Sequence, residues 1–369
     1  DSAGAVGPNH VMQAVNAGIR IQDRLGTTVR LQSLKSFWTN GVTSPDPDGF
    51  DPRRGYEPYG QRWLFAAVAN YTNNPGLLLA ISKTSDPTSD PATGWYRWFI
   101  DVDTTAPLYA ATPTVGFTKD RVVIQASMFY KSNDTHYGSY IYAFTRTDLY
   151  AGGNGSPRRF ALLEADQGGP ENAPVPAATY DTTTSTNYFL GNLNGNYQGV
   201  GWIQVYSLGG PLGAESFQAG AYYYGGPPWE HFAPQAEFLP QLGTTNKIDA
   251  GDARIHNVVM RDTLLLAAQT VFYPVTTPAR SAIQWWQVSP GGGFLAQLGT
   301  VDDPSGNVFH AYPSIAANVV GEILLGYSRF SASEYPGAYY SFQAFNDPFL
   351  HEMRPQTLLK AGEGPYEKR

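Results

Sequence analysis

The sequence predicts an all-β protein, a β-propeller of six to seven antiparallel blades. Groups of two or three strand-length apolar segments recur six times, at intervals of roughly 45 to 65 residues, which suits the repeat of a propeller blade. Charged residues make up only 15% of the chain, while Gly (39), Pro (28), Tyr (24) and Trp (8) are plentiful. This composition favours many short strands and turns, with aromatic side chains packed between sheets. No segment has a strong helical periodicity.

The clearest repeat lies between Asp249 and Val288. Three segments rich in Val, Ile, Leu and Trp follow one another there, each too short and too punctuated for a helix. A tight turn at Arg261-Asp262 and a loop from Pro274 to Pro278 separate them. The predicted strands of this antiparallel meander are Ile255–Met260, Thr263–Val271 and Ser281–Val288.

The other five repeats follow the same plan. In the first, Ile19 and Ile21 alternate with polar residues, which is the period of a half-buried strand. Two segments lack a strand pattern and are expected to be loops, at 39–58 and 209–241. The expected strands are 10–16, 18–24 and 28–34; 62–70, 76–84 and 94–102; 112–118, 121–130 and 139–146; 177–181, 187–193 and 200–208; and 312–319, 322–330 and 338–345.

Composition also limits the classes of function. The net charge of −7 and the absence of a basic stripe argue against nucleic acid as a partner. Without cysteine the chain has no disulfide, no thiolate catalysis and no Cys-based zinc site. No run of 18 apolar residues predicts a membrane span. The opening DSAGAVGPNH is typical of a processed N-terminus, and the low charge favours an extracellular or cell-surface location.

Several segments resemble a group of secreted bacterial β-propeller proteins with no settled biochemical activity. They are 1–16 (DSAGAVGPNHVMQAVN), 51–63 (DPRRGYEPYGQRW), 252–262 (DARIHNVVMRD), 281–286 (SAIQWW) and 315–341 (IAANVVGEILLGYSRFSASEYPGAYYS). The resemblance implies a propeller of sialidase-like architecture and export, although the Asp boxes of sialidases are missing. It covers most of the chain and implies no chemistry.

The domain prediction is a single propeller over residues 1–369. The segment AGEGPYEKR (361–369) resembles the lead-in to a further blade. Two alternatives follow, because a propeller closes to hide its edge strands. Either a C-terminal closing blade is missing, which predicts a partner chain near the C-terminus, or the N-terminal strand closes a ring of six.

Candidate site residues come from the first strand of each repeat, because these strands line the central channel of a propeller. Asp252, Arg254 and His256 alternate along one such strand, so they are expected to share a face and to bind a ligand. Histidine next to arginine or tyrosine also suits acid–base chemistry. The alternative is that such residues hydrogen-bond one another and fill the channel. The catalytic candidates are Glu57, Arg254, His256, His310 and Tyr312.

Two further features suggest ligand contacts. The segment 221–232 (AYYYGGPPWEHF) contains Tyr223 and Trp229, which are predicted either to stack against sugar rings or to pack over the blades. Asp46, Asp48 and Asp51 surround a Gly turn and are predicted as calcium ligands, although the spacing is not that of an EF-hand. The alternative for the segment from Asp46 to Asp51 is an ordinary turn.

The function predicted from these features is a secreted or cell-surface binding and assembly module for carbohydrate or protein. The alternative is a polysaccharide-degrading enzyme at the channel mouth. A hydrolase would need a carboxylate pair, drawn from Glu57, Asp181 and Asp252. A lyase would need a histidine or tyrosine base beside a cation, such as His256 with Arg254. A third class, a subunit of a larger assembly, predicts an exposed apolar edge near Arg369.

Overall fold

A computed structural model of the protein describes residues 3–39, 49–69, 74–102, 107–163, 169–291, 293–348 and 351–367. The chain divides into two compact units. Unit 1 comprises Asp1–Pro170, Ala178–Asn187 and Gly209–Ser216, and unit 2 comprises Glu171–Ala177, Tyr188–Leu208 and Phe217–Arg369. Among the described residues, two hydrophobic core clusters lie in unit 1 and three in unit 2. This division does not test the single domain expected over residues 1–369, which stays a prediction.

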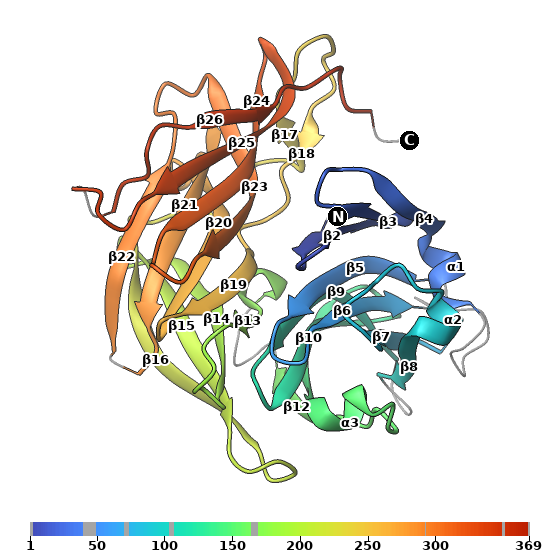
Figure 1. Cartoon of the computed structure of the whole chain (residues 1–369). Coiled ribbons are helices and arrows are strands. Elements are labelled where there is room, and N and C mark those ends of the chain that lie inside the picture. Colours follow the sequence, from blue (N-terminus) through green and yellow to red (C-terminus); the bar gives the residue numbers. More distant parts are fainter. Residues whose placement is uncertain are drawn as a thin grey trace. The chain divides into compact units, whose positions relative to one another are not determined.

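Unit 1 contains three antiparallel meanders of four strands, drawn in blue to green in Figure 1. Three short helices accompany them among the described residues: α1 (Leu34–Trp38), α2 (Pro91–Gly94) and α3 (Arg146–Tyr150). The strands are β1 (Ala3–Val6), β2 (His10–Val15), β3 (Gly18–Asp23) and β4 (Thr28–Ser33); β5 (Gly49–Glu57), β6 (Arg62–Ala69), β7 (Gly76–Ser82) and β8 (Trp95–Asp101); and β9 (Leu108–Phe117), β10 (Arg121–Tyr130), β11 (His136–Thr145) and β12 (Arg158–Leu163).

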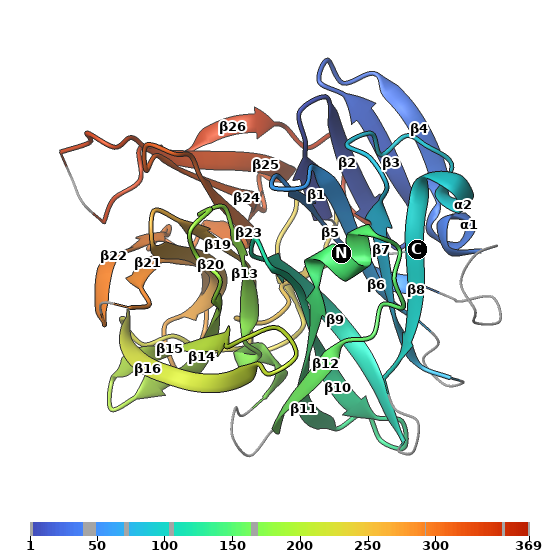
Figure 2. The same ribbon diagram turned by 60° about the horizontal axis from the view of Figure 1, so that its bottom comes forward.

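Unit 2 holds two complete meanders of the same kind and most of a third, seen from a second side in Figure 2. A two-stranded ladder and the 3₁₀ turn η1 (Pro170–Asn172) complete it. The strands are β13 (Val175–Thr179), β14 (Asn187–Tyr197), β15 (Val200–Gly209) and β16 (Ser216–Gly226); β17 (Glu237–Leu239) and β18 (Ile248–Asp249); β19 (Ile255–Arg261), β20 (Leu264–Tyr273), β21 (Arg280–Ser289) and β22 (Phe294–Val301); and β23 (Val308–Ala317), β24 (Ile323–Ser331), β25 (Glu334–Gln343) and β26 (Thr357–Lys360).

The middle strands of each meander carry the cores. β7 is buried along its whole length, and β6, β10, β20 and β21 nearly so. Such strands read as continuous apolar runs because both faces of the sheet are covered. In contrast, the last strands β12, β16 and β26 are largely exposed.

The all-β propeller fold class is confirmed, with repeats of four antiparallel strands. The number of blades stays a prediction. Of the two expected loops, the first contains β5 from Gly49 onward, and the second contains β16 and β17, so both expectations are corrected. No helix among the described residues has the length and apolar character needed to cross a membrane.

Candidate functional site

Four first strands contain a β-bulge at a similar place. In β5, β9 and β23 two residues face one on the partner strand, and in each the first of the two has a positive φ and precedes a buried proline. These residues are Asp51 (φ 50), Thr112 (φ 46) and Tyr312 (φ 57). In β19 the extra residue is His256. Bulges re-aim side chains and are frequent beside active sites, so they locate candidate functional residues.

The bulges are held by side chains of preceding elements. In unit 2, Thr270 Oγ1 of β20 accepts a hydrogen bond from Tyr312 N at 3.1 Å. In unit 1, Asp51 Oδ2 accepts from Thr112 N at 3.0 Å, and Asn16 Oδ1 accepts from Asp51 N at 2.9 Å. In all three bulges, the backbone N–H of the residue before the proline donates to a side-chain oxygen. This hydrogen bond fixes each bulge against the element that supplies the oxygen.

In unit 2 the two bulge residues meet. The rings of His256 and Tyr312 lie edge to face with centroids 6.2 Å apart. Tyr312 is 39% exposed, and its hydroxyl donates to the carbonyl oxygen of Asp249. Burial of the hydroxyl raises the pKa of Tyr312, and the nearby charge of Asp249 adds to this. Tyr312 is therefore a neutral hydrogen-bonding and stacking group at physiological pH.

Asp252 and Arg254 form a bidentate pair next to these rings. Arg254 donates from Nε to Asp252 Oδ1 at 2.7 Å and from Nη2 to Oδ2 at 2.6 Å. Burial alone would raise the pKa of Asp252, but the hydrogen bonds and charge of Arg254, with a smaller contribution from His256, outweigh it and lower the pKa. Both residues are half-buried and precede β19, which begins at Ile255, whereas Ala253 and Ile255 are buried. Only His256 of the three predicted residues lies in the strand, at its bulge.

His231 borders the pair and was not among the sequence candidates. Its carbonyl oxygen accepts from Ala253 N at 2.8 Å. Gly195 N donates to His231 Nε2 at 2.8 Å, so in the neutral ring the proton is on Nδ1, which lies 3.9 Å from Glu171 Oε1. Burial lowers the pKa of His231, although Asp252 opposes this. The signal in the sequence is only the polar pair Glu230-His231 inside an aromatic loop.

His310 lies in the interior of unit 2. Its side chain is buried, with Nε2 3.3 Å from Gln356 Oε1 and its ring edge to face with Tyr327. Burial lowers the pKa of His310, while its contact with Gln356 opposes the shift. His310 therefore suits a structural role between β23 and the segment leading to β26.

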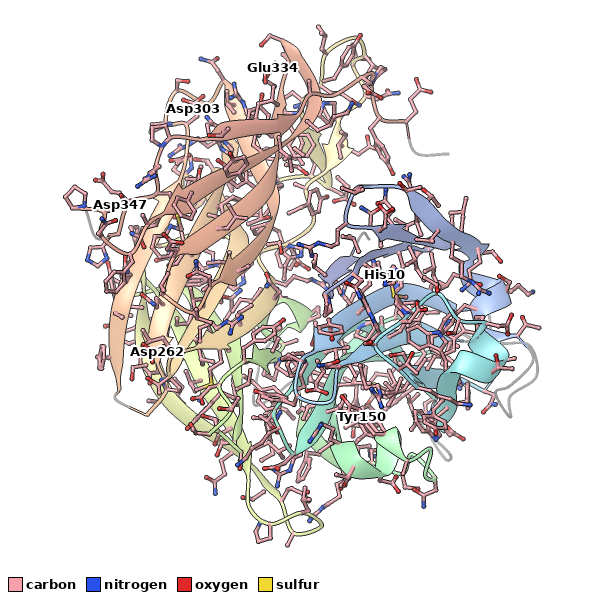
Figure 3. All side chains as sticks on the ribbon, viewed as in Figure 1. His10, Tyr150, Asp262, Asp303, Glu334 and Asp347 are labelled. Carbon is pink, nitrogen blue, oxygen red and sulfur yellow. The ribbon has the colours of Figure 1, made fainter. Side chains whose placement is uncertain are left out.

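Glu57, in unit 1, is also structural. The side chain is fully buried, and its carboxylate accepts hydrogen bonds from Tyr59 N, from Gly60 N at 3.0 and 3.1 Å, and from the Tyr150 hydroxyl. Arg146 Nη1 lies 3.7 Å away. Tyr150 belongs to α3 (Figure 3), so Glu57 ties the β5–β6 turn to this helix. Burial raises the pKa of Tyr150, and the charge of Glu57 raises it further.

Two predicted ligand contacts belong to the core. Trp229 is fully buried beside Trp286, and Tyr223 is buried with its hydroxyl donating to Ser289 O at 3.0 Å. Of the two predicted roles, packing over the blades fits both residues, because neither ring face is exposed to a ligand in this structure.

The calcium prediction stays a prediction. Asp46 and Asp48 lie outside the described residues. Asp51 is described, and its Oδ2 is already engaged by Thr112 N. Within the described ranges, no group of three or more His, Asp or Glu residues is arranged to hold a metal.

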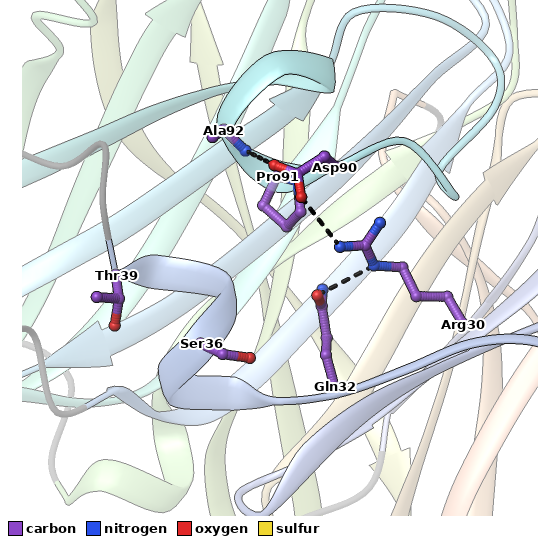
Figure 4. Close-up of a pocket in the computed structure, with 7 residues that line it drawn as sticks. All are labelled: Arg30, Gln32, Ser36, Thr39, Asp90, Pro91 and Ala92. Atoms are coloured by element: carbon purple, nitrogen blue, oxygen red, sulfur yellow. Dashed lines mark hydrogen bonds and ion pairs between the residues drawn. The ribbon is translucent and has the colours of Figure 1, made fainter.

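A pocket of about 300 Å³ lies in unit 1 (Figure 4). Its charged groups pair with each other: Arg30 Nη2 is 3.6 Å from Asp90 Oδ2, and Arg30 Nε donates to Gln32 Oε1 at 3.0 Å. Asp90 also caps α2 through Ala92 N. Each of these three side chains thus has at least one partner within the protein. It is lined by Arg30, Gln32, Ser36, Thr39, Asp90, Pro91 and Ala92.

No protein-family model and no curated protein matches the sequence. Among solved structures, a hypothetical selenium-binding protein from Sulfolobus tokodaii is similar over 98% of this chain and 81% of that chain, with 10% identity and a TM-score of 0.52. An endo-arabinase from Bacteroides thetaiotaomicron is similar over 86% and 95% (12% identity, TM-score 0.38). The hemagglutinin-neuraminidase of parainfluenza virus 5 is similar over 96% and 87% (10% identity, TM-score 0.45). At these identities the likeness concerns the fold alone.

Proposed function

We propose that this chain is a carbohydrate-binding β-propeller module whose sugar contacts are Asp252, Arg254, His256 and Tyr312 of unit 2. The observation that carries the proposal is the meeting of these four side chains at the bulges of β19 and β23. Each is at least partly exposed, and hydrogen bonds of the backbone and of the Arg254–Asp252 pair fix their positions. Prearranged polar groups beside an aromatic ring are typical of small-ligand sites.

The chemistry of the four residues suits a sugar. Sugar hydroxyls both donate and accept hydrogen bonds, and a sugar ring also has a face of C–H groups. Asp252 accepts, Arg254 donates, and His256 does either according to its tautomer. The Tyr312 ring supplies an apolar face with a polar tip.

Binding is favoured over hydrolysis by the state of the carboxylates. A glycosidase needs a carboxylic acid whose pKa is raised, so that it can donate a proton. The pKa of Asp252 is lowered by its pairing with Arg254, and the pKa of Asp181 is lowered by hydrogen bonds from Thr183. Glu57 is enclosed by three hydrogen-bond donors and the Arg146 cation, and it has no exposed surface.

A lyase is disfavoured on similar grounds. The raised pKa of Tyr312 makes it a poor base, and Arg254 is already neutralised by Asp252. We place the module outside the cell or on its surface, as the low charge and the resemblance to exported propellers favour. A surface protein as partner remains the second prediction.

The test is a glycan-array and polysaccharide-digestion screen on the intact protein, with and without a chelator. We expect binding without release of shorter sugars, and loss of binding in the double variant His256→Ala/Tyr312→Ala. The control is Phe345→Ala, which removes an exposed aromatic ring of unit 2 outside the site. Release of sugar fragments by the wild type, absent from the double variant, would replace the binding proposal by the enzyme alternative.

A further inference from the structure

The last strand of the β13–β16 meander exposes two tyrosines on one face. Tyr222 is 60% and Tyr224 46% exposed, while Tyr223 between them is only 4% exposed. Residues two apart in a strand point to the same side, with α-carbons about 6.6–6.8 Å apart. Among the described strands, β16 pairs with β15 alone, so it is an edge strand.

The strand is held firmly at this point. The Tyr223 hydroxyl donates to Ser289 O at 3.0 Å. The Gly225 carbonyl accepts from Trp286 Nε1 at 2.7 Å and from Gln284 Nε2 at 3.0 Å. A Cβ at Gly225 would lie 2.9 Å from the Trp229 ring, so glycine permits this close packing. The buried anchors alternate with the exposed tyrosines and fix the direction in which those tyrosines point.

Among the described residues, the two exposed rings have no partner of their own. Within the described part of the chain, neither the Tyr222 nor the Tyr224 side chain takes part in a ring pair, an ion pair or a hydrogen bond. At the other end of the same strand, Phe217 instead stacks on Tyr206 with centroids 5.8 Å apart. The aromatic residue at the first end of β16, Phe217, is therefore packed against another ring, whereas Tyr222 and Tyr224 near the other end are exposed.

We propose that Tyr222 and Tyr224 form a stacking platform for neighbouring sugar units of a neutral, linear polysaccharide. The proposal rests on the function proposed above and names its ligand class. The two rings come from residues two apart on one strand face, so they can contact neighbouring units of a linear chain. The anchored strand fixes the backbone that carries them before binding, which lowers the entropic cost of association. The strand from Ser216 to Gly226 carries no charged residue, which fits a neutral ligand better than an acidic one.

Addition of a protein strand is the other use of an uncharged edge. Strand addition would engage the backbone groups of β16 and would depend little on the tyrosine rings. The two uses are separated by side-chain variants that leave the backbone intact.

The experiment is affinity electrophoresis of the whole protein in gels containing soluble linear arabinan, xylan or mixed-linkage β-glucan, with polygalacturonate as the acidic comparison. We expect at least one neutral polysaccharide to retard the wild type more than polygalacturonate does. Tyr222→Ala/Tyr224→Ala should weaken that binding about tenfold, equivalent to about 1.4 kcal/mol, because both stacking rings are removed. Tyr222→Phe/Tyr224→Phe, which keeps the rings, should stay within about threefold of wild type.

The matched control is Phe294→Ala, which removes a ring that is 55% exposed on the outer strand β22. It should leave binding unchanged. If the wild type binds and His256→Ala/Tyr312→Ala does not, but Tyr222→Ala/Tyr224→Ala binds normally, the platform is refuted while the proposed function stands. Stronger retardation by polygalacturonate, or self-association of the protein that persists in Tyr222→Ala/Tyr224→Ala, also refutes it. A wild type that binds none of the polysaccharides overturns both proposals.

Discussion

Glu57 offers the sharpest test of whether a buried carboxylate is structural or functional. Its carboxylate accepts from Tyr59 N, Gly60 N and the Tyr150 hydroxyl, with Arg146 Nη1 at 3.7 Å. In Glu57→Gln one carboxylate oxygen is replaced by an NH₂ group, which cannot accept hydrogen bonds from the donors that surround it. The ion pair with Arg146 is also lost. Hydrogen bonds to charged groups contribute about 1.5–3 kcal/mol, and breaking a buried pair costs about 3–5 kcal/mol. Because Arg146 is partly exposed, we expect a loss of about 2–4 kcal/mol in the free energy of unfolding.

The assay is urea unfolding of Glu57→Gln, Tyr150→Phe and the double variant. Tyr150→Phe removes one of these bonds, so it should cost about 1.5–3 kcal/mol, and the double variant should cost less than the sum. The exposed Glu352→Gln is the control and should stay within about 0.5 kcal/mol of wild type. If Glu57→Gln were as stable as wild type yet lost ligand binding or turnover, Glu57 would be a functional residue and this reasoning would be wrong.

Two further predictions concern the bulge and the buried histidines. Thr270→Val removes the acceptor of Tyr312 N, so it should lower the affinity for ligand and reduce the free energy of unfolding in urea by about 1–3 kcal/mol. Thr270→Ser keeps the hydroxyl and should keep the affinity. Equal affinities for the two variants would contradict this prediction. Burial lowers the pKa of His231 and His310 below the ordinary 6.5, so the unfolded chain binds protons before the folded chain does. The free energy of unfolding should therefore fall as the pH is lowered through about 6.5, and the slope should decrease in His231→Gln/His310→Gln; an unchanged slope would count against it.

Four of the strands that sequence reasoning missed share a physical property, whereas β1, β5, β17 and β18 were missed for other reasons. β12, β16, β22 and β26 are last strands of their meanders and are largely exposed or half-buried, so they carry neither a continuous apolar run nor a clear alternation. The middle strands β6, β7, β10, β20 and β21 were predicted because burial on both faces requires apolar residues at nearly every position. The half-buried β3 was predicted from the alternation of Ile19 and Ile21 with polar residues. Hydrophobic pattern thus identifies the inner strands of these blades, whereas among the last strands it identified only β4 and β8.

In the candidate site too, features set by local sequence spacing were easier to predict than features set by contacts with distant segments. The spacing of Asp252, Arg254 and His256 predicted one face of a strand, but Asp252 and Arg254 precede β19 and His256 is its bulge residue, so the bridge at Asp252 and the bulge, rather than a regular strand, position them. The enclosure of Glu57 and the burial of Trp229 depend on segments far away in the sequence, such as α3 and β21. Residue type alone does not distinguish a satisfied carboxylate from an available one, because that difference lies in the partners.

The bulges connect the sequence to the site more directly than residue type does. Proline has no N–H and is excluded from a central strand, except at a bulge where no ladder hydrogen bond is needed. The dipeptides Asp51-Pro52, Thr112-Pro113 and Tyr312-Pro313 occur in such strands, and each is a bulge with a buried proline. The residue before the proline is half-buried or exposed in all three. In β5, β9 and β23 the proline therefore marks the position at which the strand turns a side chain outward, whereas Pro176 of β13 lies in regular pairing and its preceding Val175 is buried. Tyr312 is the instance where the outward side chain meets a histidine and an Asp–Arg pair.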